Sequence, residues 1–368
     1  MKSSEAWYTV VSEQAIDSPA LLVFPLRIRQ NIQLAIQMVG DVDRLRPHVK
    51  THKSKTLTRL QQAAGIHKFK CATIAEAAML GECNAADVLL AYPLQGPKIS
   101  RFIELIARFP ETRFSTLIDA AASATELARA ALQAAISIEI FVDLDLGMGR
   151  TGIKPGDEAL ALVHSVSNLE GLSFRGFHGY DGHVRDADLI TRKDRCDAAF
   201  QPVATMLATL KEQGFAQPTL VMGGSPTFPV YADYPAVECS PGTFVLWDKG
   251  YAAAFPEQKF LPAAVLLTRV ISIPSKDHIC LDLGYKAVAS ENSLENRFAF
   301  LDASGLSPVG QSEEHLVVRH PENLSYKVGD VLYALPVHVC PTVALYDKLY
   351  AIEDAVHTAT WQVDARGR

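Results

Sequence analysis

A cationic stretch at residues 46–53 carries the side chains best suited to chemistry. It reads Arg-Pro-His-Val-Lys-Thr-His-Lys, and five of its eight residues are basic or imidazole side chains. It lies between two segments with helical periodicity, which predicts the end of a strand. On a strand, His48, Lys50 and His52 would share one face. A buried lysine among cations has a depressed pKa and readily forms a Schiff base, so Lys50 is the candidate nucleophile. A basic surface loop is the alternative.

Short apolar runs alternate with amphipathic helical segments from residue 18 to about residue 237. With the strand before Lys50 they give about eight strands, which predicts a (β/α)8 TIM barrel over residues 18–237. A doubly wound open sheet is the rival fold, but no GxGxxG motif follows Phe24. The apolar runs cover residues 18–24, 70–73, 87–92, 113–118, 138–143, 172–178 and 219–222.

The pattern changes after residue 237, where helical periodicity fades and strand-like runs separated by Pro, Gly and Asn appear. We therefore expect a C-terminal all-β domain formed by residues 238–368 together with residues 1–17. Its strand-like runs cover residues 243–247, 263–273, 278–283, 315–318, 331–334 and 348–352.

Three polar motifs follow predicted barrel strands, and barrel chemistry sits at the carboxyl ends of strands. Residues 143–152 form a glycine-rich turn, and residues 177–183 combine two imidazoles, a phenol and a carboxylate. The third motif is Gly-Gly-Ser-Pro-Thr at residues 223–227. Its glycines let backbone N–H groups wrap a phosphate, and its hydroxyls assist. The candidate phosphate-binding residues are Gly223, Gly224, Ser225 and Thr227.

A His-x-Cys pair lies near the end of the chain. On a strand, His338 and Cys340 would point to the same side. Neutral imidazole and thiolate together suit zinc or another divalent transition metal. A buried cysteine beside a hydrogen-bonded histidine is the alternative.

The sequence RPHVKTHK, followed by KCATIAEA at residues 70–77, resembles the signature of the D-threonine aldolase and D-serine dehydratase family. This family has the alanine-racemase-type fold and uses pyridoxal 5′-phosphate (PLP). The resemblance runs along nearly the whole chain and implies that Lys50 carries PLP as a Schiff base. It also implies that Arg150 reaches the cofactor ring, that Tyr180 lies near it, and that His183 is a candidate catalytic base.

The same resemblance implies a divalent metal near the substrate hydroxyl, held by a His-x-Cys or His-x-Asp pair. Cys340 is the cysteine version, which resembles the D-serine and D-3-hydroxyaspartate dehydratases and favours zinc. The aspartate version is typical of the D-threonine aldolases and suits manganese or magnesium. Because the pair supplies two ligands, water or substrate oxygens must complete the metal shell.

Two reactions on D-3-hydroxy amino acids follow from the resemblance. The first is retro-aldol cleavage to glycine and an aldehyde, and the second is dehydration by an ammonia-lyase to a 2-oxo acid and ammonia. A racemase would not need the metal pair. A PLP-carrier protein of similar barrel type would lack the second domain. A homodimer is expected by resemblance alone.

The net charge and the apolar content of the sequence limit the classes of partner that we expect. The net charge is −6, so the chain has no overall attraction to nucleic acid or to an anionic membrane. We find neither an apolar run long enough to span a bilayer nor an apolar signal segment in residues 1–14. The six cysteines are scattered without a CxxC pair, which indicates a reducing compartment, and we expect a cytoplasmic protein.

Overall fold

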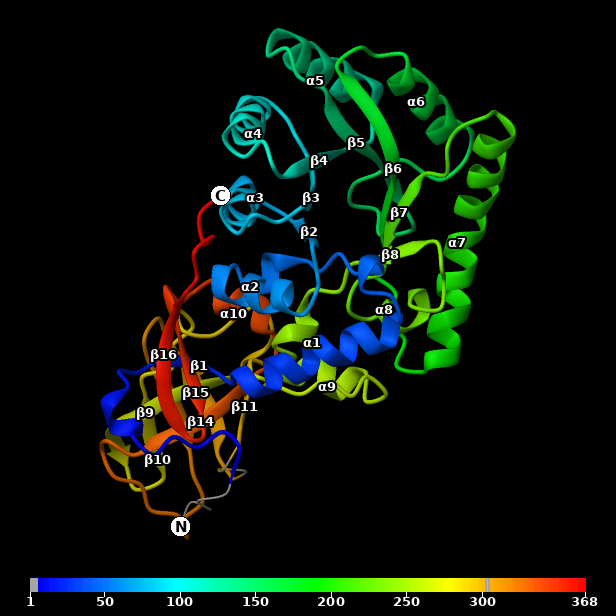
Figure 1. Ribbon diagram of the computed structural model, residues 1–368. Helices are drawn as coiled ribbons and strands as arrows, with labels where there is room; N and C mark the ends of the chain where they lie inside the picture. The colour runs from blue at the N-terminus through cyan, green and yellow to red at the C-terminus, as the bar shows by residue number, and fades with distance from the viewer. Residues whose placement is uncertain (1–5, 302, 304) are drawn as a thin grey trace. The chain divides into compact units, whose positions relative to one another are not determined.

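The computed structural model describes residues 6–301, 303 and 305–368 (Figure 1). Residues 1–5, part of the segment assigned above to the second domain, lie outside the described residues. The chain divides into two compact units, which we call the β unit and the barrel unit. The β unit comprises Met1–Leu34, Thr51–Thr56 and Thr243–Arg366. The barrel unit comprises Ala35–Lys50, Leu57–Gly242 and Gly367–Arg368.

The barrel unit is built on a curled parallel sheet in which each strand pairs with the next one along the chain. Each strand is short and rich in β-branched or aromatic residues, as a strand buried on both faces requires. The strands are β2 (Lys68–Cys71), β3 (Asp87–Pro93), β4 (Arg113–Ile118), β5 (Ile138–Asp145), β6 (Leu172–Tyr180), β7 (Thr219–Met222) and β8 (Val237–Cys239).

The seam of this sheet is closed by residues 45–48. Leu45 forms an isolated parallel bridge to Cys239 of β8, and His48 forms one to Lys70 of β2. The barrel architecture is confirmed, but the expected eight regular strands are seven within the described residues, and residues 45–48 take the first strand position. Pro47 has no N–H to donate, which limits pairing there.

The residues after this bridge form a 3₁₀ helix, Val49–Thr51, rather than the strand we predicted. The expectation that His48, Lys50 and His52 share one strand face is therefore wrong. Residues 18–24, which we counted as the first barrel strand, are not part of the barrel sheet. They contain β1 (Ala20–Val23), all of whose residues are buried, and β1 pairs with strands of the β unit.

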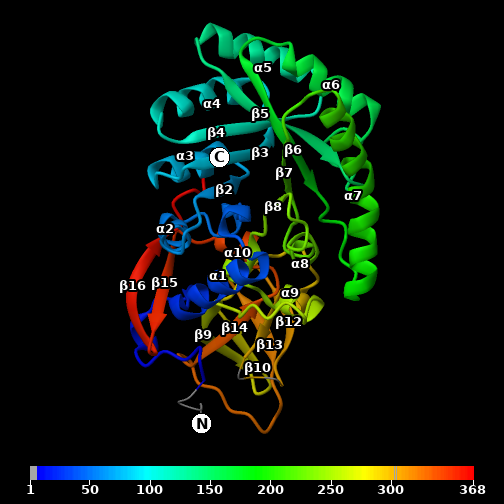
Figure 2. The same ribbon diagram turned by 45° about the vertical axis from the view of Figure 1, so that its right-hand side comes forward.

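Helices cover the outer face of the parallel sheet, and Figure 2 shows α4 to α7 arranged around it. The start of α3 illustrates how the sequence sets these elements. Thr73 accepts a hydrogen bond from the N–H of Glu76, and the Glu76 carboxylate accepts one from the N–H of Ala72, so the two side chains satisfy backbone donors at the start of the helix much as a capping box does. The helices are α1 (Pro25–Val39), α2 (Lys55–Ala63), α3 (Ile74–Glu82), α4 (Pro97–Arg108), α5 (Ala121–Gln133), α6 (Asp157–Ser167), α7 (Leu189–Glu212) and α8 (Phe228–Tyr231).

The barrel interior is built in layers. Alternate residues of β5 belong to successive layers, from the amino end of the strand to its carboxyl end. Glu139 belongs to an ion-pair belt, Phe141 to an apolar layer, and Asp143 to a polar layer with His178. The apolar layer consists of Leu89, Leu117, Phe141 and Val221. The apolar layer separates the belt from the polar groups at the carboxyl end, where barrel enzymes place their chemistry.

The ion-pair belt is organised around Arg46, whose side chain is fully buried. Its guanidinium donates to Asp87 at 2.6 Å and to Glu238 at 2.7 Å. Arg175 also pairs with Asp87, and lies 3.3 Å from Glu139. Burial alone would raise the pKa of Asp87, but the two guanidinium groups hold it well below its usual range. The belt therefore fixes the segment that leads to Lys50.

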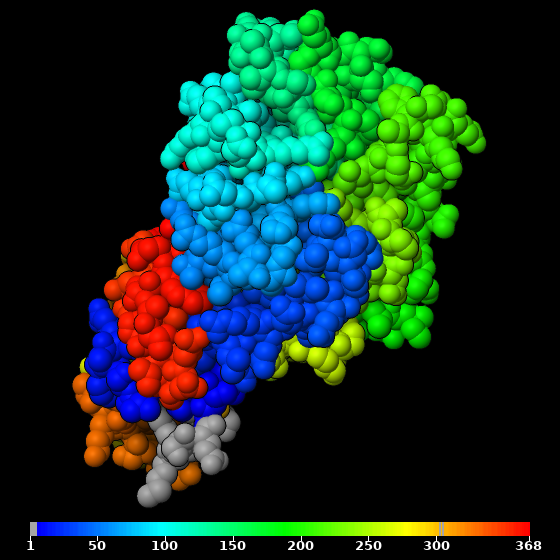
Figure 3. Space-filling model, in the orientation of Figure 1, coloured from blue at the N-terminus to red at the C-terminus, as the bar shows by residue number. Residues whose placement is uncertain are grey.

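The β unit contains a mixed sheet in which β14 and β1 flank β9. Its core packs Leu22, Val265, Leu267, Tyr333 and Ile352 together. The strands are β1, β9 (Ala264–Ser275), β10 (His278–Leu281), β11 (Phe298–Phe300), β12 (Ser307–Gln311), β13 (Leu316–Arg319), β14 (Val331–Pro336), β15 (Lys348–Glu353) and β16 (Val356–Gln362). The hairpin of β15 and β16 is exposed in Figure 3, where it is red.

Five of the six strand-like runs expected in this part of the chain overlap observed strands. The exception is residues 243–247, where the structure has a 3₁₀ helix, Thr243–Val245. The α-helices that lie wholly in this unit are α9 (Lys249–Ala254) and α10 (Val339–Val343), within the described residues. Across the residues that the structure describes, no helix combines the length and apolar character needed to cross a membrane.

Candidate functional site

The structure brings three of the candidate residues together at the carboxyl end of the barrel. Lys50 lies on the 3₁₀ helix that follows the seam, and its Nζ is 5.6 Å from the centroid of the Tyr180 ring. Arg150 comes from the loop after β5, and its Cζ is 4.9 Å from the same ring. Tyr180 ends β6. An amine and a guanidinium therefore meet at one aromatic ring, although their residues are widely separated in sequence.

Two glycines allow the backbone to approach Tyr180. A Cβ atom on Gly224 would lie 3.1 Å from the Tyr180 ring, and one on Gly182 would lie 2.3 Å from it. Gly223 has a φ of +74°, which a side chain would strain. This close approach is the kind of cradle in which a flat ring and a phosphate fit, because a backbone without side chains exposes its N–H groups.

The loops after β7 and β8 lie side by side. The N–H of Ser240 donates to the carbonyl oxygens of Met222 and Gly223, and the N–H of Gly242 lies 3.4 Å from Ser225 Oγ. Barrel enzymes often bind phosphate at these two loops. We predicted only the first loop. The Ser-Pro-Gly sequence at residues 240–242, directly after β8, is the signal that could have identified the second.

Thr227 differs from the other residues of its loop. Its hydroxyl is fully buried and donates to Asp181 Oδ1 at 2.9 Å. Burial raises the pKa of Asp181. Thr227 therefore anchors the loop to the end of β6, whereas Ser225 retains some exposure at 6%.

His183 lies against the glycine-rich loop after β5. A Cβ atom on Gly147 would come within 3.0 Å of His183 Nε2. The Nδ1 atom of His183 is buried and has no hydrogen-bond partner in the described part of the chain. Asp145 shapes the same loop by accepting hydrogen bonds from the N–H groups of Gly147 and Gly149. An unpartnered imidazole nitrogen is a group that can accept a proton.

Sequence reasoning missed a buried polar chain inside the barrel. Lys70 Nζ contacts Ser240 Oγ and lies 3.4 Å from His178 Nε2. His178 Nδ1 is 2.7 Å from Asp143 Oδ1. Burial, together with the charge of Lys50, lowers the pKa of Lys70 to about 7. Lys70 opens the KCATIAEA motif and begins the predicted strand at residues 70–73, which was the available signal.

The metal-ligand candidates lie in the β unit. β14 ends at Pro336, and His338 caps α10, so the expected strand alternation of His338 and Cys340 is wrong. Cys340 nevertheless lies near enough to His338 to raise the pKa of its imidazole. Thr51 Oγ1 lies 3.2 Å from Cys340 Sγ, and Thr243 Oγ1 lies 3.6 Å from it.

Glu291 accepts a hydrogen bond from Nδ1 of His338. Burial lowers the pKa of His338, but hydrogen bonds to Cys340 and Glu291 raise it overall to about 9. A carboxylate on one ring nitrogen leaves the other available to a metal. In the part of the chain that the structure describes, no group of three or more His, Cys, Asp or Glu residues could hold an ion. His338 and Cys340 are therefore two donors, and an ion held by them would need further ligands from outside the described chain.

Lys286, which follows β10, is an alternative candidate for the reacting amine. In the β unit its ammonium pairs with Glu313 and lies 3.8 Å from Glu314. Its side chain is 55% exposed. A paired and solvated ammonium is a poor nucleophile, so the structure favours Lys50 or Lys70.

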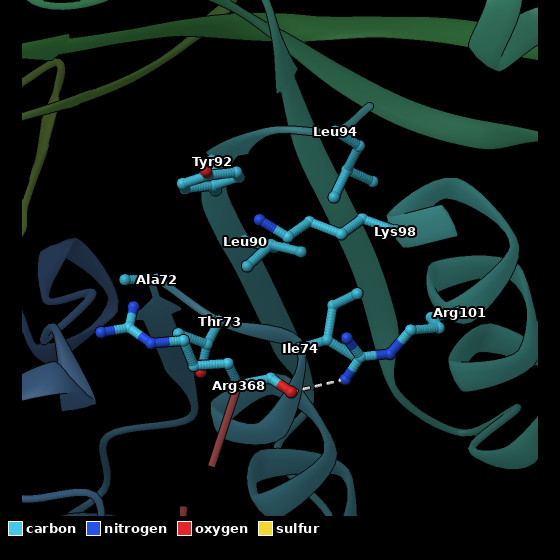
Figure 4. Close-up of a pocket in the computed structure, with 9 residues that line it drawn as sticks. All are labelled: Ala72, Thr73, Ile74, Leu90, Tyr92, Leu94, Lys98, Arg101 and Arg368. Atoms are coloured by element: carbon cyan, nitrogen blue, oxygen red, sulfur yellow. Dashed lines mark hydrogen bonds between the residues drawn. The ribbon is translucent and has the colours of Figure 1, made fainter. Parts of the chain in front are cut away.

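An outer pocket lies beside β3, as Figure 4 shows. Leu89 faces the barrel interior, so Leu90 and Tyr92 point toward the helices. The pocket has a volume of about 90 Å³. It is separate from the cluster at Lys50, because it lies on the opposite face of β3. Its lining residues are Ala72, Thr73, Ile74, Leu90, Tyr92, Leu94, Lys98, Arg101 and Arg368.

Comparison with known proteins gives two family matches. The family model described as "Alanine racemase, N-terminal domain" matches residues 26–248. A second, described as "Putative serine dehydratase domain", matches residues 263–352. The first match covers more than half of the chain and includes Lys50, Arg150 and Tyr180.

Two curated relatives are similar along almost the whole chain. A D-threonine aldolase from Arthrobacter sp. is 29% identical over 96% of this chain and 93% of its own length. A 3-hydroxy-D-aspartate aldolase from Paracoccus denitrificans is 26% identical over 97% of this chain and 94% of its own. The crystal structure of D-threonine aldolase from Filomicrobium marinum superposes with a TM-score of 0.87 at 26% identity, covering 95% of both chains.

Proposed function

Because the chain belongs to the family of the alanine racemase N-terminal domain, we propose that it is a PLP- and metal-dependent lyase acting on D-3-hydroxy amino acids. Its reaction is retro-aldol cleavage to glycine and an aldehyde, as the similarity to D-threonine aldolase indicates. The observation that carries the proposal is the meeting of Lys50 and Arg150 at the Tyr180 ring, beside two glycine-containing loops.

The residues of this cluster fit PLP by their chemistry. Lys50 would supply the amine that reacts with the cofactor aldehyde, and the Ser225 hydroxyl and the glycine backbone of the loop after β7 would hold its phosphate. Arg150 lies against the Tyr180 ring and would place a cation near a cofactor bound there. When bound, PLP withdraws electrons from the bond that breaks. Tyr180 would pack against the flat ring of the cofactor.

His338 and Cys340 are the residues that would hold a divalent metal, with zinc favoured by the thiolate and manganese or magnesium as alternatives. Glu291 would fix the His338 ring through Nδ1. A bound ion would supply Lewis-acid chemistry. In the barrel unit, His183 would be the base for the substrate β-hydroxyl, because its Nδ1 has no partner in the described part of the chain.

A dehydratase is the second candidate function. Two observations favour it, the cysteine at position 340 and the match of residues 263–352 to the putative serine dehydratase domain. In that reaction Lys50 removes the α-proton of D-serine, D-threonine or D-3-hydroxyaspartate, and the β-hydroxyl leaves. The products are a 2-oxo acid and ammonia.

A product assay with D-threonine tests the proposal directly. Glycine and acetaldehyde in equal amounts support the aldolase, whereas ammonia and 2-oxobutanoate support the dehydratase. L-Threonine serves as the matched control and should not react. Failure of D-threonine, D-serine and D-3-hydroxyaspartate to yield either product pair would overturn the proposal.

Chelation is expected to reduce turnover of D-threonine about 100-fold, because the ion contributes several kcal/mol of charge stabilisation to the transition state. Adding Zn²⁺ or Mn²⁺ should restore turnover. His338→Ala should lose the metal, as measured by elemental analysis of the purified protein. His357→Ala, which alters a half-buried histidine of the same unit, should retain it. Full metal content in His338→Ala would contradict the assignment.

A further inference from the structure

Asp181 is a buried acid at the point where β6 ends, and the proposed function gives it no role. It directly follows Tyr180, the last residue of β6, and its side chain is fully buried. Burial raises the pKa of Asp181. A buried carboxyl group is costly unless hydrogen-bond donors surround it, so the donors around Asp181 indicate what it holds in place.

Two side chains from different elements donate to Asp181. The hydroxyl of Thr227, which is also fully buried, donates to Oδ1 at 2.9 Å. The thiol of Cys196, on α7, donates to Oδ2 at 3.9 Å. A thiol is a weak donor and a hydroxyl is a strong one. The contact with Thr227 is therefore the one that can fix a loop.

Thr227 sets the shape of the loop after β7. Its N–H donates to the carbonyl oxygen of Gly224 at 3.1 Å, and the N–H of Phe228 donates to the same oxygen at 2.8 Å. The N–H of Gly224 in turn lies near enough to Asp181 to lower its pKa, against the effect of burial. A change at Asp181 would therefore reach the glycine backbone and Ser225, the groups that the proposed function assigns to the phosphate.

The end of β6 meets this loop at a second point. A Cβ atom on Gly224 would lie 3.1 Å from the Tyr180 ring, so Tyr180 contacts the loop with its ring and Asp181 contacts it with its carboxyl group. The ring and the phosphate of PLP are joined covalently, at a separation that varies little. A site for both must therefore hold its ring-binding and phosphate-binding parts at a matching separation.

We propose that Asp181 is a positioning residue for the phosphate of PLP, and that it acts through Thr227. Its carboxyl group holds the loop after β7 at a set distance from Tyr180, so that Ser225 and the glycine backbone are in place before the cofactor binds. The inference rests on the proposed function, which assigns PLP to this cluster. It adds that one buried acid aligns the phosphate-binding part of the site with the ring-binding part.

The test compares PLP with pyridoxal, which has the same ring and aldehyde but no phosphate. Equilibrium dialysis of the full-length protein measures the Kd of each compound, and the Kd of pyridoxal divided by that of PLP is the phosphate selectivity. Asp181→Ala should lower this selectivity about tenfold, the effect of losing one charge-assisted hydrogen bond. The Kd of pyridoxal should change less than about twofold, because the ring-binding part of the site is unaltered.

Thr227 and Cys196 provide matched variants. Thr227→Val removes the hydroxyl with little change in shape and should lower the selectivity as much as Asp181→Ala does. Thr227→Ser keeps the hydroxyl and should retain the selectivity. Cys196→Ala removes the other donor to the same carboxyl group and should also retain it. The double variant Asp181→Ala/Thr227→Val should be no less selective than either single variant, because both changes remove the same bond.

The outcomes separate the inference from the proposed function. Unchanged selectivity in Asp181→Ala or in Thr227→Val, with PLP still bound by the wild type, would overturn the inference alone. A further loss in the double variant would also overturn it, because Thr227 would then act on the phosphate directly. An equal loss in Cys196→Ala would overturn it as well, since that result would indicate general loosening of the core.

Absence of PLP binding by the wild type would overturn the proposed function itself. Asp181 is fully buried, so thermal unfolding of each variant is measured first. If Asp181→Ala does not fold, the comparison of Thr227→Val with Thr227→Ser decides the question, because the two variants differ in the hydroxyl that Asp181 binds. Equal selectivity in these two variants would then overturn the inference.

Discussion

Replacing Lys50 with alanine is expected to abolish covalent attachment of PLP and to lower turnover by about 10⁴-fold or more. The physical reason is that Lys50 supplies the nitrogen that reacts with the cofactor aldehyde, and Arg150 and Tyr180 cannot replace it. The measurements are the D-threonine product assay and borohydride reduction followed by peptide mapping.

Lys286→Ala is the control for this experiment, since Lys286 is exposed and paired with Glu313. It should keep both attachment and turnover. Attachment that survives in Lys50→Ala, with the label on Lys70, would show that the buried lysine is the cofactor-bearing residue. Such a result would move the reacting amine from the 3₁₀ helix to β2.

Replacing Arg46 with methionine is expected to lower the free energy of unfolding by about 3–5 kcal/mol. The substitution removes a fully buried guanidinium and leaves the carboxylates of Asp87 and Glu238 without one of their partners. Urea unfolding at neutral pH measures the change. Arg113→Met is the matched control, because Arg113 is 54% exposed and pairs with Glu139 at the edge of the same belt. Arg113→Met should lower the free energy of unfolding by less than about 1 kcal/mol.

The same belt makes stability depend on pH. Arg46 and Arg175 hold the pKa of Asp87 well below its usual range. A carboxyl group with a depressed pKa contributes stability above its unfolded pKa of about 3.9, and this contribution is lost as the pH falls toward the folded pKa. Wild type should therefore lose stability below about pH 4, and Arg46→Met should lose less over that range. An unchanged pH slope in Arg46→Met would contradict this account of the belt.

The candidate site was partly predictable because its parts are local. Lys50, Arg150 and Tyr180 each belong to a short motif next to a strand end, and strand ends of a barrel meet at one face. Lys70, Asp143 and His178 form a network only when β2, β5 and β6 are packed together. No local pattern encodes that contact, so the network could be found only in the structure.

The errors in the fold have equally specific causes. The run at residues 20–23 is apolar and buried on both faces, so its pattern predicts a strand but not its partners. Hydrogen bonding with β9 and β15 decides its place. The His-x-Cys pair follows Pro336, where a strand ends and a helix begins within two residues. Residue identity suggested the pairing of His338 with Cys340. The two residues lie at the start of α10, and not on a strand as we expected.

The seam of the barrel has a consequence for how binding and stability are linked. Backbone N–H groups of Arg46, His48 and Lys70 make the hydrogen bonds that close it, where a complete strand would form a continuous ladder. Local opening should therefore begin here, directly before Lys50. A cofactor bonded to Lys50 and bound by the loops after β7 and β8 would link residues 45–50 to the β8 side of the seam. Cofactor loading and resistance to local unfolding would then be thermodynamically coupled.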